Sequence, residues 1–204
     1  MPQESFYIYN INNGNAEITA VDVSIADDIV IPNTLGGFPV TSIGSYAFCN
    51  CTGLTNVYIT DIAAWCNIDF YDNYSNPFYY ADNLYLNNKL LIDLVIPEGI
   101  DKIPVYAFSC KNITSVTIPY SVTSIGDYAF YECSKISDIY YGSSKSNWNK
   151  INIGSGNDFS MLTIHYVSTI NGRYKFNGIL RNIVSVYVVT PNGLKTINSI
   201  KNIH

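Results

Sequence analysis

Basic residues are missing from a large part of this 204-residue chain. No lysine or arginine precedes Lys89, although nine acidic residues do. Charged residues make up only 13% of the chain, histidine and arginine occur twice each, and the formal net charge is −5. The chain therefore lacks the basic surface with which general nucleic-acid-binding proteins displace counterions from phosphates. No nucleic-acid partner is expected.

Long apolar runs are also missing. No stretch approaches the roughly 18 consecutive apolar residues that a membrane-spanning helix needs, so no membrane insertion is expected. The opening Met-Pro-Gln-Glu has neither the basic nor the apolar part of a secretory signal. In contrast, 48% of the residues are hydrophobic and 14% aromatic, which is enough for a buried core.

Charge is distributed unevenly along the chain. Residues 1–88 sum to −9, whereas residues 139–204 contain seven basic residues against Asp158 alone, a sum of +6. In an elongated fold the two ends carry opposite fields. This predicts head-to-tail self-association or an oriented partner; the alternative is incidental drift in a weakly charged surface.

Internal repetition is the main signal. Residues 96–108 and 118–130 match at an offset of 22 residues, with Ile, Pro, Ile, Tyr, Ala and Phe recurring in place. A third copy covers 40–48 and is followed by Cys51 and Leu54. A fixed period of this size is typical of solenoid proteins.

A second pattern, apolar-x-x-apolar-x-apolar, recurs in phase with the first. The last two members alternate as in a strand, with every second side chain inward. Their spacings are 28, 37, 22, 23 and 25 residues. Strands this short cannot bury their own faces, so we predict stacked coils that form one continuous parallel sheet. The six members are Ala26/Ile29/Ile31, Leu54/Val57/Ile59, Leu91/Leu94/Ile96, Ile113/Val116/Ile118, Ile136/Ile139/Tyr141 and Met161/Ile164/Tyr166.

The 37-residue and 25-residue intervals contain similar additions. Residues 61–68 and 144–151 match, each with a capping residue four positions before a tryptophan. This predicts two short helices that lay Trp and Ile over the edge of a coil. Ser75-Asn76-Pro77 predicts a further helical turn. Residues 84–91, with Asn87-Asn88 at the centre, predict a hairpin.

The ends of a solenoid need covers. We predict an N-terminal β-hairpin cap over 1–25, with its turn at Asn13-Gly14. The solenoid of about six coils then covers 26–166. Residues 167–204 are predicted to form a C-terminal β cap, with turns at Asn171-Gly172 and Asn177-Gly178. The alternative is a degenerate coil that begins at Pro191.

The composite phrase Ile-Pro-x-x-Val-Thr-Ser-Ile-Gly-x-x-Ala-Phe-x-x-Cys-x-x-Leu resembles the BspA-like class of leucine-rich repeats. The resemblance covers about 26–166 and is specific at 40–54 and 113–136. It departs at Pro104, where the phrase has glycine, and near Cys110, where the copy is one residue short. The resemblance implies a leucine-rich-repeat solenoid, an extracellular or cell-surface location, and roles in adhesion or protein binding.

Five cysteines raise the question of disulfides or metal. Three of them share one repeat position, which predicts stacked, buried thiols: Cys51, Cys110 and Cys133. Disulfides that involve Cys49 or Cys66 are the alternative. Cys49-Asn50-Cys51 lacks the two-residue spacer of a zinc site. Neither a metal nor a cofactor is expected.

Catalytic candidates are few. A histidine-dependent nucleophile would have to use His165, which lies in a predicted strand and is expected to be exposed there. Two acidic pairs, Asp27-Asp28 and Asp69/Asp72, are close enough in sequence for glycosidic chemistry. The loop that holds Asp69 and Asp72 lacks the calcium-binding phrase. We predict solvated carboxylates and no catalytic residues.

What remains is the outer face of the strands. One outward row reads Val30, Tyr58, Val95, Thr117, Tyr140 and His165; the row two residues earlier reads Asp28, Asn56, Asp93, Ser115, Asp138 and Thr163. Solenoids use such faces for binding. The alternative is that Thr and Tyr merely suit strands. The candidate interaction face is Tyr58, Asn56, Asp93, Thr117, Tyr140, Asp138 and His165.

Taken together, the sequence predicts a non-catalytic leucine-rich-repeat module that binds a protein or glycan ligand. An accessory domain of a carbohydrate-active enzyme, with its catalytic part elsewhere or in the Asp69/Asp72 loop, is the alternative. The third possibility is that the chain is a structural spacer.

Overall fold

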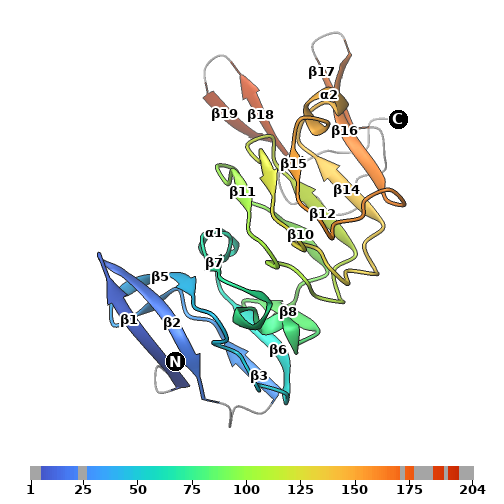
Figure 1. Cartoon of the computed structure of the whole chain (residues 1–204). Helices are drawn as coiled ribbons and strands as arrows, with labels where there is room; N and C mark the ends of the chain where they lie inside the picture. Colours follow the sequence, from blue (N-terminus) through green and yellow to red (C-terminus); the bar gives the residue numbers. More distant parts are fainter. Residues whose placement is uncertain (1–5, 23–26, 171–172, 177–185, 191–192, 198–204) are drawn as a thin grey trace.

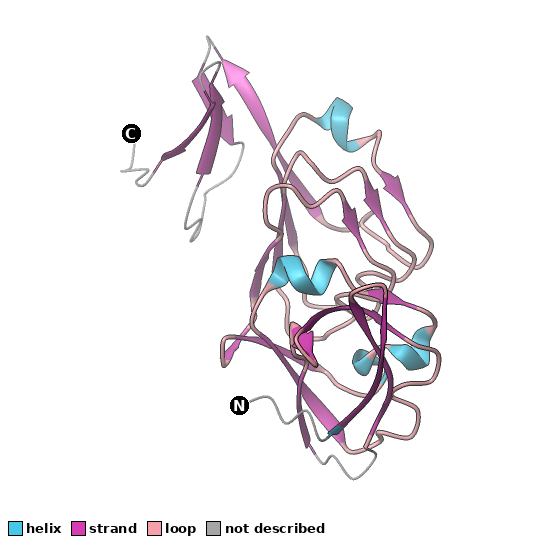
Figure 2. Cartoon of the chain, turned by 90° about the vertical axis from the view of Figure 1, so that its left-hand side faces the viewer, coloured by secondary structure: helices cyan, strands magenta, loops and turns pink. Residues whose placement is uncertain are grey.

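The structure, a computed structural model, describes residues 6–22, 27–170, 173–176, 186–190 and 193–197. The chain winds into stacked coils that supply short strands to two ladders, and the helical turns between them are few (Figures 1 and 2). The predicted solenoid of stacked coils with parallel strands is therefore confirmed.

The first ladder contains the strands predicted from the apolar pattern. Its first sheet holds β3 (Asp27–Val30), β6 (Leu54–Ile59) and β8 (Asn83–Leu86) in parallel, with β9 (Lys89–Leu90) antiparallel at the end. Its second sheet holds β10 (Asp93–Val95), β12 (Ser115–Ile118), β14 (Asp138–Tyr141) and β16 (Thr163–Ile170) in parallel, with β17 (Arg173–Phe176) antiparallel. Within each sheet the predicted register is confirmed; for example, Val116 lies beside Leu94 and Ile139.

The second ladder uses the phrase that contains Gly44 and Gly126. It consists of β2 (Asn15–Val21), β5 (Phe38–Ile43) and β7 (Asp69–Phe70), and then β11 (Lys102–Ile103), β13 (Ser124–Ile125) and β15 (Asn152–Ile153). β4 (Thr34–Leu35) pairs with β5 in a small hairpin. The register places the inward residues Ile18, Ile43 and Phe70 in one stack.

Neither ladder is continuous, which corrects the prediction of one unbroken sheet. The longest interval folds back as the hairpin β8–β9, so β10 starts a new sheet. Within the described residues, β11 pairs with β13 alone and not with β7. The longest interval thus contains a hairpin that interrupts the pairing of successive coils, and the apolar spacing does not reveal this.

The departure at Pro104 lies beside this break. A Cβ on Gly126 would lie 2.5 Å from the backbone nitrogen of Val105 in the preceding coil, so this coil requires glycine there. Pro104 occupies the corresponding position at the end of β11, the first strand after the break. A side chain is tolerated because β11 pairs with no preceding strand in the described part of the chain.

Side-chain hydrogen bonds join the two halves at the break. The Trp65 indole Nε1 donates to the Ala107 carbonyl at 2.8 Å, and the Asn76 amide donates to the Tyr106 carbonyl at 2.8 Å. The buried Asn112 accepts a bond from the Leu84 backbone nitrogen at 3.1 Å and donates to the Leu91 carbonyl. These side chains satisfy backbone groups that regular strand pairing would satisfy elsewhere.

The short helices form where capping residues were predicted. α1 (Ile62–Cys66) begins after Asp61, whose carboxylate accepts from Ala63 and Ala64, and α2 (Lys145–Trp148) begins after Ser144. The 3₁₀ turns η2 (Asn73–Ser75) and η3 (Pro77–Tyr79) lie between α1 and β8, and Asn76 caps η3. Both tryptophans are buried, as expected.

Hairpins occupy both ends of the described chain. β1 (Tyr7–Asn12) pairs antiparallel with β2, and the turn between them has the positive φ of Asn13 and Gly14, 50° and 78°. β2 is also the first strand of the second ladder. β18 (Val186–Thr190) and β19 (Gly193–Ile197) form an antiparallel pair. Pro191, Asn171-Gly172 and Asn177-Gly178 lie outside the described residues, and the boundaries of the two predicted caps stay a prediction.

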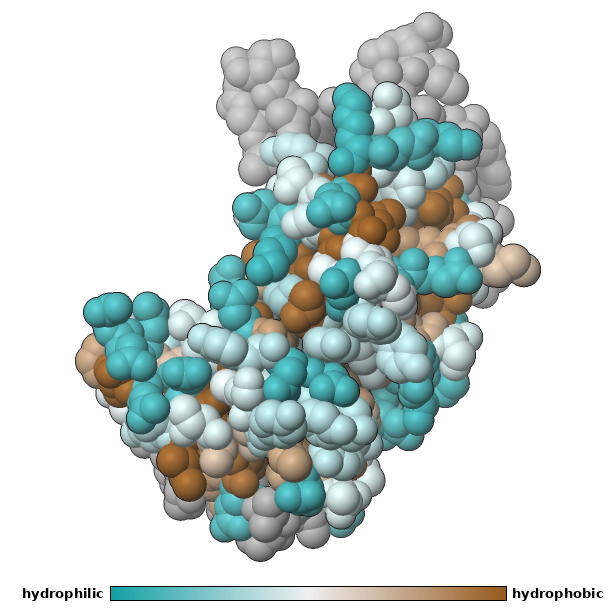
Figure 3. Space-filling view, in the orientation of Figure 1, coloured by the Kyte–Doolittle hydropathy of each residue, from teal (hydrophilic) through white to brown (hydrophobic). Residues whose placement is uncertain are grey.

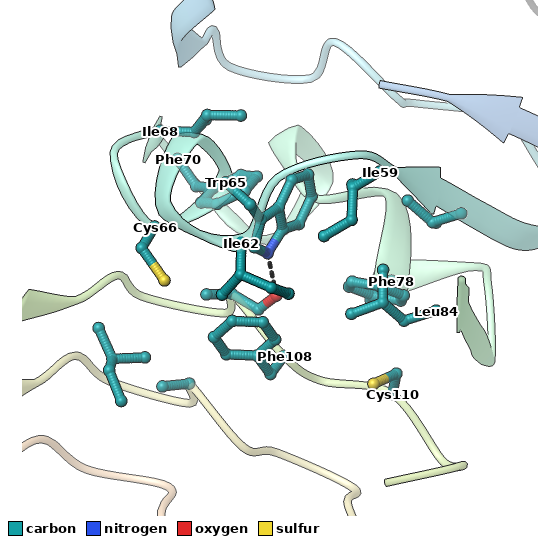
Figure 4. Packing of buried hydrophobic residues seen from close by; sticks show 14 of the residues in the cluster. Ile59, Ile62, Trp65, Cys66, Ile68, Phe70, Phe78, Leu84, Phe108 and Cys110 are labelled. Atoms are coloured by element: carbon teal, nitrogen blue, oxygen red, sulfur yellow. Dashed lines mark hydrogen bonds between the residues drawn. The ribbon is translucent and has the colours of Figure 1, made fainter. Parts of the chain in front are cut away.

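A single hydrophobic cluster extends through the coils, and Figure 4 shows its part around Trp65, Phe78 and Phe108. Phe108 stacks on Phe130 with centroids 5.8 Å apart. One inward residue was wrongly predicted, because Met161 is 89% exposed. Turns over 158–162 shift the chain before β16, so Leu162 packs against the cluster instead.

Candidate functional site

The first half of the predicted interaction face is an aromatic pair beside three polar side chains. Tyr58 stacks on Tyr85 with ring centroids 4.6 Å apart, and the Tyr58 hydroxyl donates to Asp28 at 3.3 Å. The Asn56 amide donates to Asp28 at 2.6 Å and accepts from Asn83 at 3.0 Å. Burial and the nearby Asp28 carboxylate raise the pKa of the Tyr58 hydroxyl, so it remains a neutral donor.

The second half repeats this arrangement with histidine. Tyr140 stacks on His165 with centroids 4.5 Å apart. The His165 Nε2 lies 2.7 Å from an Asp138 carboxylate oxygen, and the Ser137 hydroxyl donates to the other oxygen at 2.6 Å. The hydrogen bond with His165, followed by that with Ser137, lowers the pKa of Asp138, so the carboxylate stays charged.

Two further candidates lie on the same sheet. Asp93 is exposed and accepts a hydrogen bond from the Ser115 hydroxyl at 2.6 Å. Thr117 is half-buried and lies between Val95 and Tyr140 in the register of the strands. The structure thus brings Thr117 beside Tyr140 and His165, whereas Asn56 and Tyr58 belong to the other sheet.

Sequence reasoning missed Asn83 and Tyr85, which belong to the first half of this face. Their strand was interpreted only as part of a hairpin, but β8 also pairs in parallel with β6. The signal was available, because Asn83-Leu84-Tyr85-Leu86 repeats the polar-apolar-aromatic-apolar order of Asn56-Val57-Tyr58-Ile59.

His165 is less accessible than predicted. Only 12% of its side chain is exposed, because it packs on Tyr140 and bonds with Asp138. A side chain at an outward position of a strand need not be exposed to solvent when a ring from the neighbouring strand covers it. The expectation of an exposed histidine was therefore wrong.

The carboxylates considered for catalysis have other contacts. Asp72 caps η2 by accepting from the Ser75 backbone nitrogen at 2.7 Å. Asp69 forms an ion pair with Lys102 at 3.2 Å. Asp28, from the pair Asp27-Asp28, accepts hydrogen bonds from Asn56 and Tyr58. In the part of the chain that the structure describes, no three His, Cys, Asp or Glu side chains are placed to hold a metal ion.

All five cysteines are free thiols. Cys51 and Cys110 are buried as predicted, whereas Cys133 is half-buried. Burial, followed by the nearby Asp61 carboxylate, raises the pKa of Cys66 to about 12, and burial also raises that of Cys110. These buried thiols remain protonated near neutral pH and contribute to packing.

A second aromatic surface was not predicted. The residue before the recurring Ala-Phe is tyrosine in three copies, and Tyr46, Tyr106 and Tyr128 all have φ between 55° and 59°. Tyr46 stacks on Tyr74, and Tyr106 on Tyr128 with centroids 5.5 Å apart. The recurring tyrosine is visible in the sequence. Its left-handed backbone and the stacking of its ring are visible only in the structure.

Stacked coils that carry the recurring Ile-Pro and Ala-Phe phrases identify the chain as a leucine-rich-repeat protein. A model of the BspA-type leucine-rich repeat region matches residues 24–153 with six copies. The chain belongs to this BspA-type leucine-rich-repeat family.

The solved structures that match part of the chain are leucine-rich proteins of bacteria. A leucine-rich repeat protein of T. pallidum is 17% identical with a TM-score of 0.46, over 76% of this chain and 81% of that chain. A leucine-rich cell surface protein of Faecalibacterium prausnitzii is 24% identical with a TM-score of 0.43, and the match covers 74% of this chain and 42% of that one. A leucine-rich-repeat protein of Bacteroides ovatus is 15% identical with a TM-score of 0.23, over 73% and 66%.

Two searches found nothing, one among curated proteins and one for a membrane-spanning helix in the described part of the chain. No curated protein matches the chain. Among the described residues, no helix has the length and hydropathy needed to cross a membrane.

Proposed function

We propose that the chain is a non-catalytic binding module that acts outside the cell or at its surface, and that it binds a protein ligand through the outer face of the first ladder. The observation that carries this proposal is the recurrence of one arrangement on both sheets. Tyr58 with Tyr85, and Tyr140 with His165, are stacked rings beside a carboxylate.

Stacked rings suit a protein interface for a physical reason. Each ring is already held by its neighbour, so little side-chain entropy is lost when a partner covers it. The Tyr58 hydroxyl and the Asp28 and Asp138 carboxylates add polar groups at fixed positions. Aromatic anchors with polar groups around them are typical of binding hot spots.

The extracellular setting is supported by the resemblance to BspA-like surface proteins and by membership of that family. The opposite charge sums of residues 1–88 and 139–204 support a further contact, head-to-tail association of copies. Sedimentation at low and high salt measures it, with association expected only at low salt.

The test uses the double variant Tyr58→Ala/Tyr140→Ala on an array of extracellular host proteins and glycans. The wild-type chain is expected to bind at least one protein, and the double variant to bind it at least about tenfold more weakly, as expected when hot-spot rings are removed. The matched control is Tyr131→Ala, which removes a 49% exposed ring from the turn after Phe130. If the double variant lost stability as much as affinity, the two rings would be structural. If the only ligands were glycans and the double variant bound them more weakly, this face would be assigned to carbohydrate instead.

A further inference from the structure

The break in the second ladder leaves an open cleft. It lies between β7 and β11, where the chain from α1 to β7 passes between β5 and β11 (Figure 1). Its volume is about 560 Å³, within the range of about 300–1,000 Å³ that small-molecule sites occupy. It is separate from the face of the first ladder, because its walls come from the second ladder.

Five of the eight residues that line the cleft are polar, and the other three are Phe70, Tyr71 and Val105. Side chains with hydroxyl, amide, carboxylate and ammonium groups line it: Thr41, Ser42, Asn67, Asp69 and Lys102. Hydroxyls and amides both donate and accept hydrogen bonds, the carboxylate accepts, and the ammonium donates. Most small-molecule sites are lined mainly by apolar side chains, so this cleft suits a ligand whose surface carries many hydroxyl groups.

The charges in the cleft cancel. Asp69 and Lys102 bond at 3.2 Å, and both side chains are well exposed, 73% and 53%. The pair therefore presents a donor and an acceptor to the cleft without a net field that would attract an ion. A phosphate-bearing ligand would need more basic groups than the single Lys102 among the cleft-lining residues.

Tyr71 adds an aromatic platform. Its side chain lines the cleft and is 65% exposed. It occupies the position that Gly44 holds in the preceding coil, since Ile43 and Phe70 are paired in register. An exposed aromatic face packs against the apolar C–H face of a sugar ring, while the hydroxyls at the rim of that ring reach polar side chains.

Further tyrosines continue beyond the cleft on both of its walls. From Tyr71 the chain leads to Tyr74, which stacks on Tyr46 with centroids 5.3 Å apart. From Val105, which also lines the cleft, it leads to Tyr106, which stacks on Tyr128. Figure 3 shows that hydrophilic and hydrophobic side chains alternate over this side of the molecule, without one large apolar patch.

We propose that the cleft between β7 and β11 binds a neutral oligosaccharide. Tyr71 packs against one sugar ring, and Asn67, Asp69 and Lys102 bond its hydroxyls. The tyrosine stacks beyond the cleft contact the neighbouring sugar units. This carbohydrate site is distinct from the protein-binding face, so one chain can hold a glycan and a protein at the same time.

The test is calorimetric titration of the full chain with neutral hexasaccharides of β-1,4-glucan, α-1,4-glucan, β-1,4-xylan and α-mannan. At least one is expected to bind, with an affinity that added sodium chloride does not change, because no charge is neutralised. Tyr71→Ala should lower this affinity about tenfold, the upper end of what one aromatic contact contributes. Tyr71→Phe should retain it, because the ring face is kept.

The matched control is Tyr120→Ala, which removes another exposed ring, 53% accessible, and should leave the affinity unchanged. Tyr58→Ala/Tyr140→Ala should also bind the saccharide normally, which separates this proposal from that for the first ladder. The proposal is overturned if none of the four hexasaccharides binds, or if Tyr71→Ala binds as well as the wild type.

Discussion

The two halves of the solenoid stack in different ways. From β10 onward, coils of 22, 23 and 25 residues pair strand on strand in both ladders. Before β10, the interval of 37 residues contains α1, two 3₁₀ turns and the hairpin β8–β9, and both ladders end there. Coils of similar length thus join strand to strand. At the break the two halves join through side-chain hydrogen bonds, together with the backbone bond from the Lys111 nitrogen to the Asp82 carbonyl at 2.8 Å.

This difference has a cost and a benefit. At the break, Trp65 and Asn76 must satisfy backbone groups of the next coil, and Asn112 must satisfy backbone groups of the preceding one. The benefit is the cleft beside Asp69 and Lys102, because a continuous ladder would fill that space with backbone. The three predictions below test the comparison.

The largest effect is expected in the regular half. Phe130→Ala removes a buried ring that stacks on Phe108, and should lower the free energy of unfolding by about 3–5 kcal/mol through lost transfer energy and a cavity. Thr117→Ala, at a half-buried outward position of β12, should change it by no more than about 0.5 kcal/mol. Urea denaturation measures both. Equal effects would show that the inward and outward positions are not distinguished energetically.

An intermediate effect is expected at the break. Trp65→Phe removes the indole donor to the Ala107 carbonyl, whereas Trp148, at the matching position of α2, has ring contacts with Tyr141 and Phe159. A buried acceptor left without its donor costs about 1–3 kcal/mol. Trp65→Phe should therefore destabilise by about that much more than Trp148→Phe in the same denaturation assay. A larger loss from Trp148→Phe would contradict a role of side chains in joining the halves.

The smallest effect concerns pH and the second half of the face. Because the pKa of Asp138 is lowered in the folded chain, its bonds with His165 and Ser137 stabilise above the ordinary pKa of an aspartate, about 3.9. This stabilisation is lost as the pH falls through the lowered pKa. Asp138→Asn should therefore cost less than about 1 kcal/mol at neutral pH, and nothing in strong acid.

Urea titrations of the wild type and of Asp138→Asn across the acid range measure this difference. Thr117→Ala is the control, since a hydroxyl does not titrate there and Thr117 lies between Val95 and Tyr140 in the register of the strands. A constant difference between Asp138→Asn and the wild type at all pH values would contradict a contribution from the charged carboxylate.

Much of the fold could be predicted because it depends on local pattern. The helix caps Asp61 and Ser144 act within four residues, and the Asn13-Gly14 turn acts between adjacent strands. The repeat of Ile96 and Ile118 sets which strands are neighbours once the coils stack. These relations need only the period of the chain.

The candidate site was predicted less completely. The outward rows are in the predicted register, but Tyr85 was missed and His165 is covered by Tyr140. The cleft was not predicted at all, because it depends on where a 37-residue coil leaves its neighbour unpaired. The substitutions at Tyr71 and Pro104, both at the glycine position, were the available signals.

The stacked coils, the alternation of inward and outward side chains, and the short helices with their caps all follow from the amino-acid sequence. Each depends on contacts between residues that lie a few positions apart or one coil apart. Where the ladders end, which rings stack, and which polar groups face the cleft depends on how the whole chain packs. Those features arise because side chains far apart in the sequence compete for the same space, and a pattern of residue types does not record which of them occupies it.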